Sequence, residues 1–113
     1  MVILDKQISI SQLTSIATEV YGDMVKAVAD VSKNLLAIDA ELHSDLEEIL
    51  LENGSKQEDL WGFNIYPEME GEDFIEFDSL INIRPRQNNR SRDVEDGEIR
   101  RKIIDIVNKH IAR

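Results

Sequence analysis

The stretch from Leu60 to Arg92, LWGFNIYPEMEGEDFIEFDSLINIRPRQNNRSR, decides the fold because its pattern predicts two strands and a polar loop. Apolar residues occupy every second position in its first part: Trp61, Phe63 and Ile65. The same alternation returns between Phe74 and Pro85: Ile75, Phe77, Ile81 and Ile83. A period of two is typical of a strand with one buried face. The intervening segment 67–73 contains a proline and a glycine, which suits a connection between antiparallel strands.

The other side of these two strands is polar. A turn centred near Glu70 places Asn64 opposite Glu76, and Gly62 opposite Asp78. The outward face would then carry six residues: Asn64, Tyr66, Glu76, Asp78, Asn82 and Arg84. Solvated sheet faces are also polar, so this face is either simply exposed to water or part of a binding site.

The flanking segments predict helices and a hairpin. Ser9 and Gln12 form a capping-box pattern before a helix over 10–21, and Ser44 does the same before a helix over 44–53. The segments 24–31 and 35–38 read as a hairpin, and a last helix begins near Asp93 or Asp96 and runs to about Ala112. The predicted order is α-β-β-α-β-β-α. We therefore expect a single α+β domain over 1–113, with a two-layer architecture: a four-stranded antiparallel sheet with three helices packed on one face.

The charge of the chain limits the classes of molecule that it is expected to bind. The 113-residue chain has a net charge of −10 and no cysteine, which excludes disulfides and thiolate chemistry. Residues 1–83 hold four basic and eighteen acidic side chains, whereas residues 84–113 hold nine basic and five acidic ones. An acidic surface argues against nucleic acid and anionic membranes as partners. The N-terminal segment fails as a signal peptide and no apolar run is long enough to span a membrane, so we expect a cytoplasmic protein.

The strongest candidate site is the loop over 85–95, which follows the predicted strand at 74–85 and is called the arginine–asparagine loop below. Four arginines fall within nine residues there, interleaved with amides. Arginine binds carboxylate or phosphate through two parallel hydrogen bonds, and amides add uncharged donors. The predicted ligand-binding residues are Asn64, Asn82, Arg84, Arg86, Asn88, Asn89 and Arg90. The alternative is a solvated loop whose arginines neutralise nearby acids.

A metal-dependent hydrolase or nuclease is the alternative from another class. Its ligands would be Glu41, His43, Asp45, Glu76 and Asp78. Carboxylates and imidazole can bind a divalent metal that generates hydroxide from water. No established metal-binding motif accompanies them, and a helix-entry segment with His43 on the surface is the better explanation of the first three. The preferred interpretation therefore includes no metal and no cofactor.

Three runs carry a resemblance: GDMVKAVADV, ELHSDLEEILLENGSKQEDLWGFNIYP and EFDSLINIRPRQNNRSRDVED. Together they resemble a small uncharacterised prokaryotic family of unknown function, over nearly the whole chain. The resemblance implies a shared architecture and no particular activity.

The sequence thus favours a small binding or interaction protein over an enzyme. The expected partner is a small anionic ligand or an acidic protein surface. An antiparallel sheet with a free edge and a polar face further predicts a homodimer.

Overall fold

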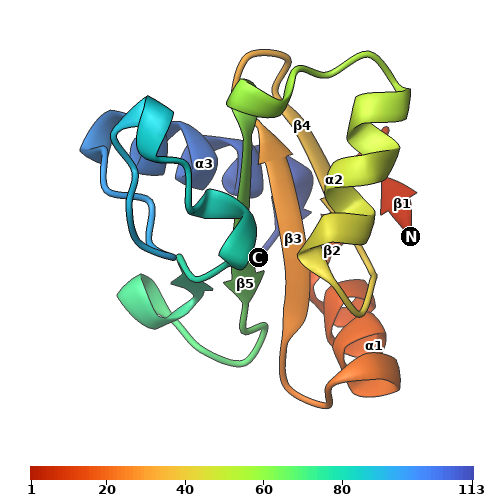
Figure 1. The fold of residues 1–113 in the computed structure, drawn as a ribbon. Coiled ribbons are helices and arrows are strands. Elements are labelled where there is room, and N and C mark those ends of the chain that lie inside the picture. Colours follow the sequence, from red (N-terminus) through yellow and green to blue (C-terminus); the bar gives the residue numbers. More distant parts are fainter.

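An antiparallel sheet of five strands forms the centre of the fold, in the order β1-β4-β3-β5-β6 (Figure 1). The computed structural model describes all residues, 1–113. The strands of this sheet are β1 (Val2–Ile3), β3 (Val25–Asp30), β4 (Leu35–Ile38), β5 (Leu60–Ile65) and β6 (Ile75–Glu76). A second, parallel pair joins β2 (Ile8–Ser9) to β7 (Ile111–Ala112).

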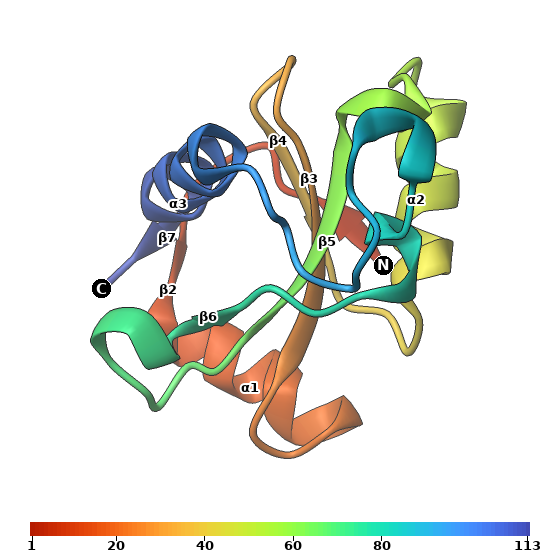
Figure 2. The same ribbon diagram turned by 60° about the vertical axis from the view of Figure 1, so that its left-hand side comes forward.

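Helices cover both faces of the sheet. Figure 2 shows the sheet between α3 (Gly97–His110) on one side and α2 (His43–Glu52) on the other. The larger core lies on the side of α3 and of α1 (Ile10–Val20), and it includes Phe63, Ile103 and Leu13. The smaller core lies beneath α2 and contains Val28, Ala37, Leu46, Leu50 and Leu60. The prediction of an α+β fold with three helices and an antiparallel sheet is therefore confirmed.

Two details of the predicted architecture are wrong. The sheet has five strands rather than four, because Val2 and Ile3 pair with Ile38 and Ala37 at the edge. The helices do not share one face, because Val28, Ala37 and Leu60 make part of the second face of the sheet apolar as well. A sheet that is apolar on both faces needs a helix on each.

Several local predictions are confirmed. Ser9 caps α1 through the predicted capping box with Gln12. The hairpin β3–β4 turns at Asn34, which has a positive φ of 59° as that turn requires.

The predicted capping box of α2 is wrong. α2 begins one residue earlier than predicted, with Leu42 rather than Ser44 at the N-cap, and no side chain caps it. No helix is both long and apolar enough to cross a bilayer.

The predicted long strand over 74–85 is the main local error. β6 contains only Ile75 and Glu76, after which short 3-10 turns follow at Leu80–Asn82 and Pro85–Gln87. Ile75 and Phe77 pack partly against the larger core, whereas Ile81 packs against the smaller core on the opposite face. Ile83 is exposed. The alternation predicted one buried face, but the chain leaves the sheet and wraps around its edge.

The side chain of Asn82 takes the place of the missing strand beside β5. Its Oδ1 accepts a hydrogen bond from the Gly62 N–H at 2.8 Å, and its Nδ2 donates to the Gly62 carbonyl at 2.9 Å. One amide group therefore pairs with both backbone groups of Gly62, as a neighbouring strand would. Asn82 is fully buried, so these backbone groups have no access to water as a substitute. Asn82, which the alternation placed on the outward polar face, is thus part of the sheet edge.

Gly62 is required because the chain after β6 lies directly on it. A Cβ at this position would meet Ser79 Oγ at 2.6 Å and Ser79 Cβ at 2.7 Å. Both are closer than atoms can approach without a shift of the surrounding structure. The absence of a side chain at Gly62 therefore lets the 79–82 turn close over β5.

Replacing Asn82 by Ala should lower the free energy of unfolding by about 2–5 kcal/mol, because two buried backbone groups of Gly62 lose their partners. Urea unfolding of the variant measures this change. Asn108→Ala removes an exposed amide on α3 and serves as the control, with a change below about 0.5 kcal/mol. Equal effects of the two substitutions would contradict a structural role for the Asn82 amide.

Candidate functional site

The residues of the predicted site fall into two separate places. Asn64 lies in the row of polar residues that crosses β3, β5 and β6, where it pairs with Lys26 on one side and Glu76 on the other. The predicted opposition of Asn64 and Glu76 is therefore confirmed. The remaining predicted residues lie farther along the chain, beside Gly62 and the start of β5: Asn82, Arg84, Arg86, Asn88, Asn89 and Arg90.

Arg84 is directed at the backbone of the protein. Its guanidinium donates to the carbonyls of Gln57 and Leu60, the latter at 2.5 Å, and it stacks over the Trp61 ring at 4.2 Å. Burial lowers the pKa of Arg84, while the carboxylates of Glu47 and Asp59 act in the opposite direction. The planar fork of Arg84 thus closes the end of β5 next to the Asn82 pairing.

Asn89 organises the loop from inside. Its Nδ2 donates to the carbonyl of Asn82 at 2.8 Å and to that of Asp93 at 2.7 Å, while its Oδ1 accepts from the Glu95 N–H at 2.9 Å. Asn89 is 3% exposed. Arg86, Asn88 and Arg90 are exposed, and their side chains form no hydrogen bond or ion pair. Ligand binding by this loop stays a prediction, and these three side chains are the ones free to contact a ligand.

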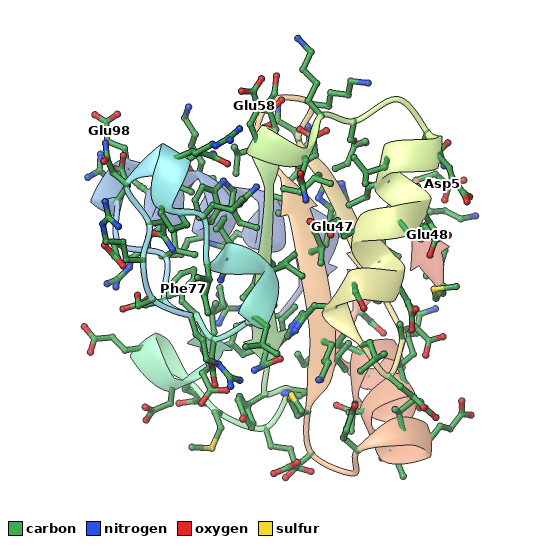
Figure 3. All side chains as sticks on the ribbon, in the orientation of Figure 1. Asp5, Glu47, Glu48, Glu58, Phe77 and Glu98 are labelled. Atoms are coloured by element: carbon green, nitrogen blue, oxygen red, sulfur yellow. The ribbon has the colours of Figure 1, made fainter.

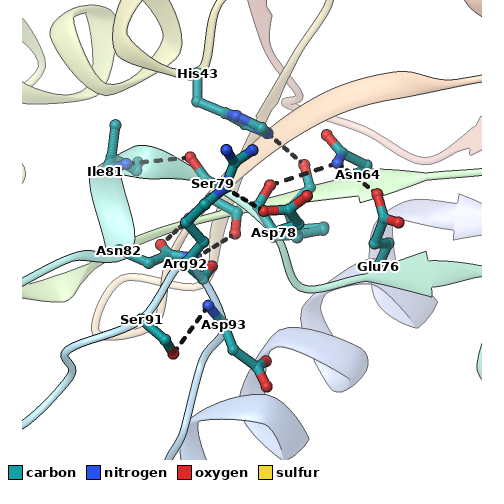
Figure 4. Close-up of polar contacts among 12 residues, drawn as sticks. His43, Asn64, Glu76, Asp78, Ser79, Ile81, Asn82, Ser91, Arg92 and Asp93 are labelled. Atoms are coloured by element: carbon teal, nitrogen blue, oxygen red, sulfur yellow. Dashed lines mark hydrogen bonds and ion pairs between the residues drawn. The ribbon is translucent and has the colours of Figure 1, made fainter.

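A polar cleft of about 450 Å³ opens on the α2 side of the sheet, around Asn64. Its floor is the row Lys26, Asn64 and Glu76. The first residues of α2 form one wall, and the chain from Asp78 to Ile81, together with Arg92, forms the other. Figure 4 shows His43, Asn64, Asp78 and Arg92 gathered around it. The cleft exists because β6 stops at Glu76 and the chain then turns away from the sheet.

The acidic end of the cleft is held by a small network. Asn64 Nδ2 donates to Glu76 Oε1 at 2.8 Å, and the Tyr66 hydroxyl donates to the same oxygen at 3.1 Å. The pKa of Tyr66 is raised, first by burial and then by the hydrogen bond and charge of Glu76, so the hydroxyl keeps its proton. Arg92 Nε pairs with Asp78 Oδ1 at 2.5 Å. The two carboxylates therefore have fixed positions.

His43 is buried rather than on the surface as predicted. Its Nε2 lies 2.8 Å from the Phe63 carbonyl oxygen. Because a carbonyl oxygen can only accept, Nε2 carries the hydrogen and donates it in the neutral ring. The pKa of His43 is lowered, mainly because burial penalises the charged ring. The Phe63 bond opposes this shift, Lys26 adds to it, and Asn64 and Asp78 oppose it.

The five residues of the alternative metal site do not assemble. His43, Glu76 and Asp78 line the cleft, whereas Glu41 and Asp45 do not. No group of three or more His, Cys, Asp or Glu side chains in the protein lies close enough together to hold a metal ion. Other acidic side chains, among them Asp5, Glu58 and Glu98, stand at the periphery of the fold (Figure 3).

Burial of neutral His43 should make stability depend on pH. The unfolded chain takes up a proton near the ordinary histidine pKa of about 6.5, whereas the folded protein does so only at lower pH. The contribution of neutral His43 to the free energy of unfolding is therefore fully present above about pH 6.5. It is lost as the pH falls toward the lowered pKa of His43 in the folded protein. Urea unfolding at about pH 7.5 and about pH 5.5 should show a smaller decrease for His43→Gln than for wild type. His110→Gln is the control, and an unchanged decrease in His43→Gln would contradict this account.

Comparison with known proteins adds a family and no activity. No curated protein and no solved structure matches the chain. The model of a family described as a protein of unknown function, DUF5674, matches residues 2–110. This range contains the whole central sheet, all three helices and the polar cleft. The resemblance in the sequence to an uncharacterised family is therefore confirmed, and the chain belongs to the DUF5674 family of proteins of unknown function.

Proposed function

We propose that this protein binds a small anionic ligand in the polar cleft. The observation that carries the proposal is the position of the α2 N-terminus, which opens into the cleft without a capping side chain. The first backbone N–H groups of a helix have no acceptor within the helix, and the helix dipole favours negative charge there. α2 has ten residues, and Leu42, His43 and Ser44 at its start all line the cleft. Such a site is suited to a carboxylate or a phosphate.

Two cationic side chains support the same proposal. Lys26 lies on the cleft floor and belongs to no ion pair, although its Nζ lies 5.3 Å from the centre of the Tyr21 ring. Arg92 uses Nε for Asp78, which leaves its two Nη groups without a hydrogen bond. A ligand anion would therefore meet an ammonium, a guanidinium and the free amides of a helix start. All three interact more strongly with an anion than with a neutral group.

The size and charge of the protein favour a discrete ligand over a polymer. The cleft volume of about 450 Å³ is within the range of small-molecule sites. The net charge of −10 repels long polyanions, whereas a small anion in the cleft interacts mainly with the groups within a Debye length of about 8–10 Å. The exposed arginines Arg86 and Arg90 remain available for an acidic protein surface, the other partner predicted from the sequence.

Replacing Lys26 by Gln should weaken anion binding by about 10- to 150-fold, the equivalent of one charge-assisted hydrogen bond of roughly 1.5–3 kcal/mol. Isothermal titration of acetate, propionate and inorganic phosphate against wild type and variant measures the effect. Arg92→Gln should weaken binding in the same direction, because Arg92 lines the same cleft and its two Nη groups have no partner in the protein.

Arg90→Gln is the matched control, since it removes the same charge from a loop position outside the cleft. Its affinity should stay within about twofold of wild type, because a screened, exposed charge contributes little at this distance. Equal losses in Arg90→Gln and Lys26→Gln would move the anion site to the loop. Absence of saturable binding by wild type would rule the proposal out.

A further inference from the structure

The charges on the cleft floor are arranged as a dipole. Lys26 on β3, Asn64 on β5 and Glu76 on β6 occupy one row across three neighbouring strands. Neighbouring strands lie about 4.8 Å apart, so the backbones of Lys26 and Glu76 are separated by about 10 Å. Neither side chain belongs to an ion pair, with each other or with any other group. The cleft therefore presents an unpaired cation at one end and an unpaired carboxylate at the other.

The surroundings of the two ends strengthen this polarity. The N-terminus of α2 opens into the same cleft as Lys26 and adds donors that favour an anion. On the β6 side, Glu76 has no cationic partner, whereas the charge of Asp78 is already matched by Arg92 on the cleft wall. One Glu76 oxygen, Oε1, accepts from Asn64 and Tyr66, while Oε2 has no hydrogen-bond partner. This end is suited to a ligand that donates.

The middle of the floor contains an acceptor without a donor. Asn64 is 6% exposed, and its Nδ2 donates to Glu76 Oε1 and to the Asp78 carbonyl. These two acceptors fix which way the amide points, and Oδ1 lies buried on the side of the His43 ring, without a hydrogen bond of ordinary geometry. A buried acceptor of this kind is stabilised by any group that brings a hydrogen to it. A simple anion is repelled by the negative end of this amide dipole, whereas an ammonium is attracted to it.

We propose that the ligand of the polar cleft is a zwitterion that carries a carboxylate and an ammonium group, as amino acids do. This inference rests on the proposed anion-binding function and specifies its ligand class. The carboxylate lies between Lys26 and the first amides of α2. The ammonium lies toward Glu76, donates to its free oxygen and brings its positive charge near the negative end of the Asn64 amide. The dipole of the ligand is thus antiparallel to the dipole of the cleft floor.

Matched ligand pairs test the inference, because each pair differs only in the amino group. Wild-type protein is titrated with propionate against alanine and β-alanine, and with butyrate against 4-aminobutyrate. The amino member of at least one pair should bind ten or more times more tightly than its carboxylate. The series also measures the separation of charges that the cleft prefers. The comparison needs no variant, so it does not depend on a substitution being tolerated by the fold.

A variant then locates the ammonium. Glu76→Gln keeps an oxygen that can accept from Asn64 and Tyr66 but removes the negative charge, so the affinity ratio within each pair should fall toward one. Glu98→Gln removes the same charge from the exposed start of α3 and should leave the ratio as in wild type.

The possible results separate the two proposals. Carboxylates that bind as tightly as their amino partners, or a ratio that persists in Glu76→Gln, would overturn the zwitterion while anion binding stands. Absence of binding by every member of the series would overturn anion binding and the zwitterion together.

Discussion

The pairing of the Asn82 amide with the backbone of Gly62 is the contact on which the rest of this structure depends. β5 is flanked by β3 along its whole length, but β6 accompanies it for only two residues. The exposed remainder of a central strand would leave backbone groups without partners and open to another chain. Asn82 satisfies both groups of Gly62, and Arg84 satisfies the Leu60 carbonyl. Side chains therefore close a sheet edge that the backbone leaves open.

This solution determines where the cleft lies. The chain can leave the sheet after Glu76 because Asn82 returns to complete it, and the departure opens the space between β6 and α2. Gly62 allows the returning turn to lie against β5, and Asn89 fixes the loop that follows by bonding three carbonyls and one N–H. The edge, the loop and the cleft are consequently parts of one arrangement. A change at Asn82 would reach the cleft through the chain between Asp78 and Arg92.

Burial of His43 links the cleft to the fold in a second way. The ring bonds the Phe63 carbonyl on β5 from the first turn of α2, so it fixes the helix start over the sheet. A neutral ring suits this position, because a charged one would be desolvated and would face the positive end of the helix dipole. The lowered pKa of His43 reflects the first of these costs. The same helix start is the anion-binding element of the proposed site, so its position matters for function as well as for stability.

The sequence by itself determined the helices, the β3–β4 hairpin, the strand β5 and the α+β class, because these depend on local periodicity, capping and turn chemistry. The Ser9–Gln12 capping box and the Asn34 turn are examples in which neighbouring residues suffice. The sequence also pointed to the Asn64–Glu76 contact, since strand register follows from alternation around a turn.

Only the tertiary structure decided which face each helix covers and what the polar residues after β6 do. The alternation at Ile81 and Ile83 would be the same in a strand and in a chain that wraps around the sheet edge. A period of two gives the spacing of the apolar residues but does not say which segment they pack against. Asn82, Arg84 and Asn89 have the composition of a ligand site, yet their groups are directed at backbone far away in sequence. Lys26 and Arg92 were absent from the predicted site because nothing in their sequence neighbourhoods relates them to Asn64. Their meeting depends on long-range strand register and on the path of a loop, which no local pattern encodes.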